Sequence, residues 1–303
     1  MTTAPAPTPT QPTAIHTIAP AVTHSHAPLP LPSHFNPLRM IRMIIGSREL
    51  AFALARREVE NRYKANVLGI VWALATPLAL LAVYTFVFGV VFHARWGNDP
   101  EGGLGHFALN VFLGLIVFAV FREVVARSPG LIVNNRQYVK RIVFPLECLS
   151  IADLLVALFN FAVGCVVWLV GFVLITGSTP HWQDLLLPVL MLPVILTALG
   201  VSWFLSALGV FLRDIQHAVE LAITVLMFLT PVFYQLDRVP EKYRIYLEWN
   251  PVAQVMEAGR NAAVDGTQPD WSRFAIALVA SLFIATIGFG VFSKAKRAFA
   301  DVL

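Results

Sequence analysis

The stretch LSIADLLVALFNFAVGCVVWLVGFVLIT, residues 149–176, decides the fold class of this chain. Its one charged residue, Asp153, lies near its start, and the remaining positions carry no Asp, Glu, Lys or Arg. About 20 consecutive apolar residues are enough for a helix to cross the ~30 Å hydrocarbon core of a bilayer. The stretch therefore predicts a membrane-spanning helix.

Five further apolar stretches resemble it, and only 13% of the 303 residues are charged. A soluble domain usually has about 25% charged residues, so a soluble fold is excluded. The expected fold is an all-α integral membrane protein with six transmembrane helices. The second span is short, and it could be bent or re-entrant. The predicted spans are about 67–92, 107–121, 149–176, 185–212, 215–234 and 274–293.

The basic residues flank the apolar stretches, which gives the membrane topology and argues against a nucleic-acid partner. Of the 22 Lys and Arg residues, 16 lie in 36–64, 122–149, 213 and 294–297, and six lie on the other side. The positive-inside rule then places both termini in the cytoplasm. The 235–273 loop is more basic than this rule favours, so we expect a folded segment there.

Two segments precede the first span. Residues 1–35 contain eight prolines and no charged residue, which predicts a disordered cytoplasmic tail. Residues 36–64 predict an N-terminal amphipathic helix in the membrane interface, although a solvated cytosolic helix has a similar pattern. Its expected apolar face carries Phe52, Ala55, Val59 and Tyr63. Its expected i,i+4 ion pairs are Arg56–Glu60, Glu58–Arg62 and Glu60–Lys64.

Motifs for chemistry are missing from the sequence. It has no phosphate-binding loop, no serine-hydrolase or zinc-protease motif, and only two cysteines, 17 residues apart on one predicted helix. We therefore expect a chain that is not an enzyme and binds no metal or cofactor. Ion-coupled pumps usually carry ionisable residues mid-membrane, whereas here the span centres are nearly uncharged. A transporter of this kind must take its energy from a partner.

Several ordered motifs resemble the ABC-2-type permeases that export polysaccharides such as O-antigen, teichoic acid and capsule. RREVENRYKANVLGIVWALATPLALLAVYTFVFGVVF (Arg56–Phe92) supplies the family's Arg62, Tyr63, Leu68, Gly69, Trp72 and Pro77. NNRQYVKRIVFPLECL (134–149) follows the second span, with Tyr138 where the family prefers Leu. Further matches are FLRDIQH (211–217), TPVFYQLDRVP (230–240, with Thr230 for Ser), EWNPVAQVMEAGR (248–260) and the ending AFADVL. Residues 36–303 would form the ABC-2-type transmembrane domain.

The resemblance implies a homodimeric permease in the bacterial cytoplasmic (inner) membrane, paired with two copies of a separate ATPase. ATP and Mg would bind to that partner. The loop after the second span would dock on the ATPase and couple its movements to the permease. The coupling residues would be Asn135, Arg136, Lys140, Arg141, Phe144, Pro145 and Glu147.

The implied substrate is an undecaprenyl-pyrophosphate-linked glycan, taken from the cytoplasmic leaflet of the membrane lipid. The pyrophosphate would meet Arg56, Arg57, Arg62 and Tyr63. Trp72, Tyr84 and Phe88 are candidates for the glycan path, although aromatic residues also pack in helix bundles. Two alternatives stay open: an ABC-2 exporter of a small lipophilic molecule or drug, and a membrane-embedded glycosyl- or acyltransferase.

Overall fold

A computed structural model describes residues 34–64, 69–93, 96, 103–139, 144–212 and 214–303. The side chains of 63, 64, 69–74, 76 and 77 are not described. The described residues from 34 to 303 belong to one compact unit, and residues 1–33 lie outside the described part. Every regular element in the described ranges is a helix, so the predicted all-α class is confirmed there.

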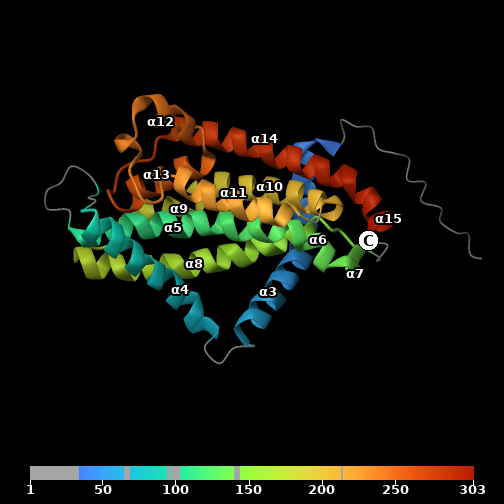
Figure 1. Cartoon of the computed structure of the whole chain (residues 1–303), viewed down its shortest axis with the longest axis horizontal. Coiled ribbons are helices and arrows are strands. Elements are labelled where there is room, and N and C mark those ends of the chain that lie inside the picture. The colour runs from blue at the N-terminus through green and yellow to red at the C-terminus, as the bar shows by residue number, and fades with distance from the viewer. Residues whose placement is uncertain (1–33, 65–68, 94–95, 97–102, 140–143, 213) are drawn as a thin grey trace, which may run out of the picture. The chain divides into compact units, whose positions relative to one another are not determined.

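Four continuous helical stretches are long and apolar enough to cross a membrane. They are Leu104–Asn134, Cys148–Thr176, Trp182–Phe211 and Trp271–Val302. Each is built on one long helix, respectively α5 (Leu104–Arg127), α8 (Cys148–Thr176), α10 (Leu192–Phe211) and α14 (Trp271–Ala295), shown in Figure 1. The first and fifth predicted spans correspond to shorter apolar helices, Leu78–Val91 and Ile215–Leu229. The former comprises the end of α4 (Gly69–Tyr84) and the π-helix η1 (Thr85–Val91), and the latter is α11.

The second predicted span is a full-length, continuous helix. The stretch 107–121 was expected to be short, whereas α5 begins at Leu104 and ends at Arg127. It packs against α8, α10, α11 and α13 (Pro251–Ala263). The last turns of α5 carry the charged residues Glu123 and Arg127, so the apolar run ends before the helix does and the span looked short from the sequence. Other helices surround α5, so these charges lie against protein.

α10 and α14 form the most extensive helix pair, and small residues make their close approach possible. A Cβ at Gly288 would lie 1.9 Å from the carbonyl oxygen of Gly200, and one at Gly200 would lie 2.6 Å from the Cα of Ala285. Small residues at helix contacts are typical of membrane proteins, where dispersion forces between backbones replace the hydrophobic effect. These positions fix where α14 sits, and thereby the loop that precedes it.

The N-terminal region forms α2 (Pro37–Gly46) and α3 (Arg48–Lys64). α3 packs on α8 through Ala55, whereas Phe52 is 64% exposed. The end of the predicted tail belongs to the folded unit: His34 is buried, with Nδ1 3.3 Å from Ser293 Oγ on α14. His34 and Phe35, the last two residues of the predicted tail, are thus part of the folded unit, and residues 1–33 lie outside the described part.

The loop 235–273 contains the folded segment that its charges predicted. It comprises η4 (Leu236–Arg238), α12 (Glu241–Glu248) and α13. Asn250 caps α13 by accepting from the Val252 N–H, and Pro251 occupies the first helical position. Asp270 in turn caps α14 by accepting from the N–H groups of Ser272 and Arg273. Two side-chain caps thus fix the starts of α13 and α14.

Candidate functional site

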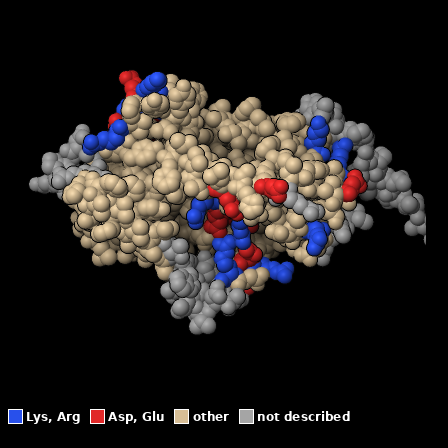
Figure 2. All heavy atoms as spheres, viewed as in Figure 1, with Lys and Arg blue, Asp and Glu red and all other residues tan. Residues whose placement is uncertain are grey.

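A network of charged side chains joins α3, α5 and α8 at the point where α3 meets the other helices. Arg62 Nη1 lies 2.6 Å from Glu123 Oε1, and the other oxygen of Glu123 accepts from Asn160 at 2.8 Å. Arg127 pairs with Glu58 at 2.8 Å and with Asp153 at 3.1 Å. In Figure 2, Lys, Arg, Asp and Glu gather beside α3 and near the ends of the molecule, and most of the remaining described face is uncharged.

This network contains three carboxylates and two guanidinium groups. Asp153 is the most buried of the carboxylates, with a side chain that is 13% exposed. Charges inside an apolar bundle need partners, because an isolated ion there is costly. The two arginines meet that need and, since they lie on different helices, they tie the second half of α3 to α5 and α8. The network is therefore suited to holding α3 in place.

The residues predicted to receive the pyrophosphate do not form one cluster. Arg62 is engaged by Glu123, and Arg56 pairs with Glu60 at 2.9 Å with its side chain 73% exposed. The predicted pair Arg56–Glu60 is thus confirmed, whereas Glu58 and Arg62 pair with α5 instead of with each other. Arg57 is exposed and has no ion-pair partner among the described residues. The side chains of Tyr63 and Lys64 lie outside them.

The predicted coupling loop follows α5 through three short elements, η2 (Ser128–Gly130), α6 (Leu131–Asn134) and α7 (Arg136–Val139). Asn135 donates its amide to the Leu131 carbonyl at 2.9 Å, and Arg136 is exposed. Phe144 stacks on Tyr138 with ring centroids 4.4 Å apart, and Pro145 is half-buried. Lys140 and Arg141 lie outside the described residues. Arg136 is thus the charged coupling candidate that the structure places at the surface.

Glu147, the last residue of the predicted coupling set, faces inward. Its side chain is 9% exposed and forms an ion pair with Lys296, Oε2 to Nζ, at 2.9 Å. Its carbonyl accepts from the buried indole of Trp203 at 3.1 Å. Glu147 therefore joins the start of α8 to the segment after α14, and its carboxylate is occupied inside the chain.

Two of the three candidates for the glycan path belong to one aromatic cluster. Tyr84 lies 4.5 Å from Phe233, centroid to centroid, and Phe88 stacks on Phe233 at 5.2 Å with an interplanar angle of 9°. Phe233 is buried, and Tyr84 and Phe88 are half-buried. The side chain of Trp72 lies outside the described part. Phe233 was missed from the sequence because it follows α11 and is distant along the chain.

The most buried charged group was also missed from the sequence. Arg260 on α13 is 4% exposed and donates to the carbonyls of Asn110 at 3.0 Å, Pro231 at 2.6 Å and Val232 at 2.7 Å. Its guanidinium also lies 4.4 Å from the ring centre of Trp96. Burial lowers the pKa of Arg260 to about 9, so it remains protonated at neutral pH. Three carbonyls and an aromatic face thus compensate its charge.

Comparison with known proteins places these features in a family. Residues 49–264 match the model of the ABC-2 type transporter. The chain is 26% identical over 259 residues to an O-antigen export system permease protein, RfbA, of Klebsiella pneumoniae, covering 84% of this chain and 95% of that protein.

Two further relatives extend the comparison. RfbA of Myxococcus xanthus is 26% identical over 266 residues, covering 87% of this chain and 99% of that protein. The polysialic acid transport protein KpsM of Escherichia coli is 30% identical over 216 residues, covering 71% of this chain and 81% of that protein. The family model covers most of the chain, including α3, the charge network, the loop after α5 and the Arg260 site. The chain therefore belongs to the ABC-2 type transporter family, and relatives with the O-antigen export function align along nearly their whole length.

Proposed function

We propose that this chain is the membrane-spanning permease subunit of an ATP-driven exporter of a lipid-linked polysaccharide. The observation that carries the proposal is the alignment with O-antigen export permeases over 84–87% of this chain and 95–99% of the relatives. The sequence has no phosphate-binding loop, so a separate ATPase would hydrolyse ATP with Mg. The chain is then a transport subunit and not an enzyme.

In the proposed assembly, two copies of the chain pair in the bacterial inner membrane, with both termini in the cytoplasm. The two shorter apolar helices, Leu78–Val91 and Ile215–Leu229, join the four long ones to make six spans. On this topology the charge network, the loop after α5 and the Glu147–Lys296 pair lie toward the cytoplasm. The surface that includes Arg136 would contact the ATPase.

The lipid-linked substrate would enter beside α3, which we propose lies in the membrane interface. Arg56 and Arg57 are exposed basic residues in the middle of this helix and suit a pyrophosphate, since guanidinium groups bind phosphates through paired hydrogen bonds. Arg62 instead holds α3 in place, because it already forms an ion pair with Glu123. The glycan would then pass outward along the side of the chain that carries Tyr84 and Phe88.

Purification of the tagged chain from its native membranes tests the assembly. A second polypeptide with a phosphate-binding loop should co-purify in about equal amount and give ATPase activity. Arg136→Glu should weaken the association, whereas Arg297→Glu, an exposed residue of the C-terminal segment, is the matched control. Purification of the chain alone, with no ATPase bound, would contradict the proposal.

Deletion of the gene tests the substrate. Lipid-linked glycan should accumulate inside the cell, and surface polysaccharide should disappear. Sensitivity to lipophilic drugs with normal surface polysaccharide would indicate the small-molecule exporter instead. Turnover of a sugar or acyl donor by the purified chain would indicate the transferase.

A further inference from the structure

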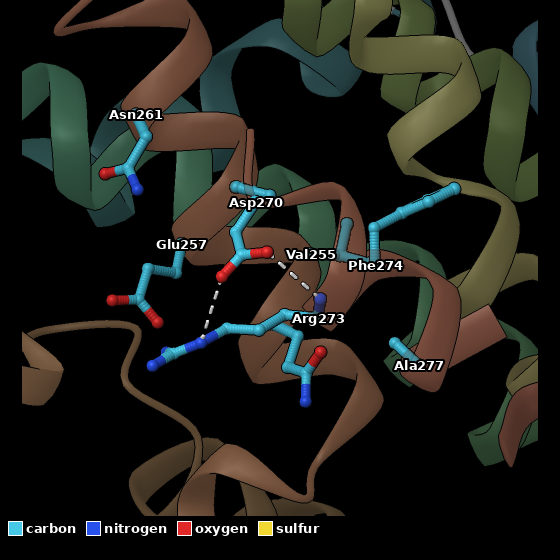
Figure 3. Close-up of a pocket in the computed structure, with 9 residues that line it drawn as sticks. Val255, Glu257, Asn261, Asp270, Arg273, Phe274 and Ala277 are labelled. Carbon is cyan, nitrogen blue, oxygen red and sulfur yellow. Dashed lines mark hydrogen bonds and ion pairs between the residues drawn. The ribbon is translucent and has the colours of Figure 1, made fainter. Parts of the chain in front are cut away.

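A cavity between α13 and the start of α14 combines polar side chains with an apolar wall. Its volume is about 210 Å³, and it is lined by Gln254, Glu257, Asn261, Asp270, Arg273 and Phe274 among others. Pockets for drug-sized ligands usually measure about 300–1,000 Å³, so this cavity suits a smaller group. Figure 3 shows that Glu257 and Asn261 reach it from α13, while Asp270 and Arg273 come from the start of α14.

Some of the lining residues hold the cavity's shape. Arg273 Nε lies 3.4 Å from Asp270 Oδ2, and its Nη1 lies 3.8 Å from Glu248 on α12. Asp270 also caps α14 through its other oxygen. These contacts fix the guanidinium of Arg273 between α12 and α14 and leave its Nη2 group without an ion-pair partner among the described residues.

Other lining residues have hydrogen-bonding capacity that the protein leaves unused. The side-chain oxygen of Gln254 is buried and has no hydrogen-bond partner in the described part of the chain, although its amide nitrogen donates to the Glu248 carbonyl. Neither the Glu257 carboxylate nor the Asn261 side-chain amide has a hydrogen-bond or ion-pair partner among the described residues. Figure 3 accordingly draws no dashed line to either of them. Buried polar atoms are normally paired, so the unpaired oxygen of Gln254 indicates that water or a ligand completes it, whereas Glu257 and Asn261 are half-exposed and can reach the same ligand.

The mixture of groups defines the ligand chemistry. Gln254 and Glu257 offer acceptors, whereas Asn261 and Arg273 offer donors. Phe274 and the alanines of both helices form an apolar side of the cavity. A sugar ring meets these features, since its hydroxyls both donate and accept and its C–H face packs on apolar surface. A simple cation would use only the acceptors, and a simple anion would use only the donors.

We propose that this cavity binds a single sugar ring of the exported glycan. The inference rests on the proposed function, which supplies a saccharide, and on the proposed topology, which places the start of α14 on the outer side. It adds to that function a defined contact for one residue of the glycan near the exit.

Binding of simple glycosides to the full-length protein in lipid nanodiscs tests the proposal. The probes are the methyl glycosides of glucose, galactose, mannose and N-acetylglucosamine, measured by saturation-transfer difference NMR. At least one of them should show ring-proton signals with the native protein. Glu257→Gln, which keeps the shape, should weaken binding about tenfold, because it replaces a charged acceptor. Ala258→Phe, which fills the cavity, should abolish it.

Tyr246→Ala is the matched control, because Tyr246 on neighbouring α12 is 75% exposed and does not line the cavity. It should bind like the native protein. Absence of signals for every glycoside, or binding that survives both cavity variants, would overturn the proposal. Ethanolamine as a further probe separates a lipid amine: signals from ethanolamine alone that disappear in Glu257→Gln would also overturn it.

The gene deletion described above keeps the two proposals distinguishable. Loss of surface polysaccharide on deletion, together with no glycoside binding, would contradict the proposed sugar site and support the proposed export function. Normal surface polysaccharide on deletion would contradict the proposed export function itself, whatever the result of the binding experiment.

Discussion

The guanidinium of Arg260 occupies the space that a side chain at Gly114 would fill. A Cβ at position 114 would lie 2.3 Å from Nη2 of Arg260 and 3.3 Å from the carbonyl oxygen of Val232. Gly114 belongs to α5, Arg260 to α13, and Val232 to the segment after α11. One missing side chain therefore allows one buried cation to hold three parts of the chain together.

Gly114→Ala should destabilise the protein, because the methyl group meets both the guanidinium and the carbonyl that binds it. Overpacking of this kind typically costs about 1–3 kcal/mol. Thermal unfolding of the purified protein in detergent measures the change. Gly171→Ala on α8 is the control, since a Cβ there meets only Leu109 Cδ2, at an ordinary 3.8 Å. Equal melting temperatures for the two variants would contradict this view of the site.

Arg260→Lys should also destabilise the protein, although it keeps the charge. An ammonium group is a compact donor and cannot reach three carbonyls that are arranged around a planar guanidinium. Each carbonyl that is left buried and unpaired costs about 1–3 kcal/mol. We expect a loss of folded protein by size-exclusion chromatography of membrane extracts. Arg297→Lys, at an exposed site, should have no effect.

The sequence predicts the long helices well, because uncharged stretches such as 149–176 have few alternatives to a membrane helix. It also predicts a folded segment in 235–273 from an excess of basic residues. Arg260 accounts for part of that excess, yet its partner Asn110 lies 150 positions away. The signal that could have identified Arg260 is its place within an otherwise apolar helical pattern, VAQVMEAGRNAAV (252–264).

The charge network was less accessible to sequence reasoning. Spacing of i and i+4 correctly gives Arg56–Glu60, which lies on one helix face. The same rule fails for Glu58 and Arg62, whose partners Arg127 and Glu123 lie 69 and 61 residues away. Arg62 pairs with Glu123, which is less exposed than Glu58, and charges that are better shielded from water interact more strongly. Which residues pair depends on how the helices pack, and the spacing of residues along one helix does not show this.

Exchange of the charges of Arg62 and Glu123 tests whether the network holds α3. Arg62→Glu places a fourth carboxylate beside Glu123 and should destabilise the protein, and adding Glu123→Arg should restore part of the loss. We expect a coupling of about 1 kcal/mol, because both side chains are partly exposed and Asn160 still needs Glu123. Proteolysis within α3 is the local measurement. Losses of Arg62→Glu and Glu123→Arg that simply add would show that the pair does not couple.

Glu257 should make the stability of the protein fall as the pH rises. Burial raises the pKa of Glu257; Arg273 opposes this, while Asp237 and Glu248 add to it. The folded state thus binds the proton of this carboxyl more tightly than the unfolded chain, whose glutamates titrate near pH 4.3. The contribution of Glu257 is therefore fully favourable below that pH and is lost as the pH rises through the folded pKa.

Glu257→Gln, which stays neutral, should remove this part of the pH dependence and be at least as stable at pH 7. Melting temperatures of both proteins between pH 4.5 and 8 measure it, and parallel curves would contradict it. Because the variant keeps its stability, its predicted loss of glycoside binding cannot be attributed to unfolding.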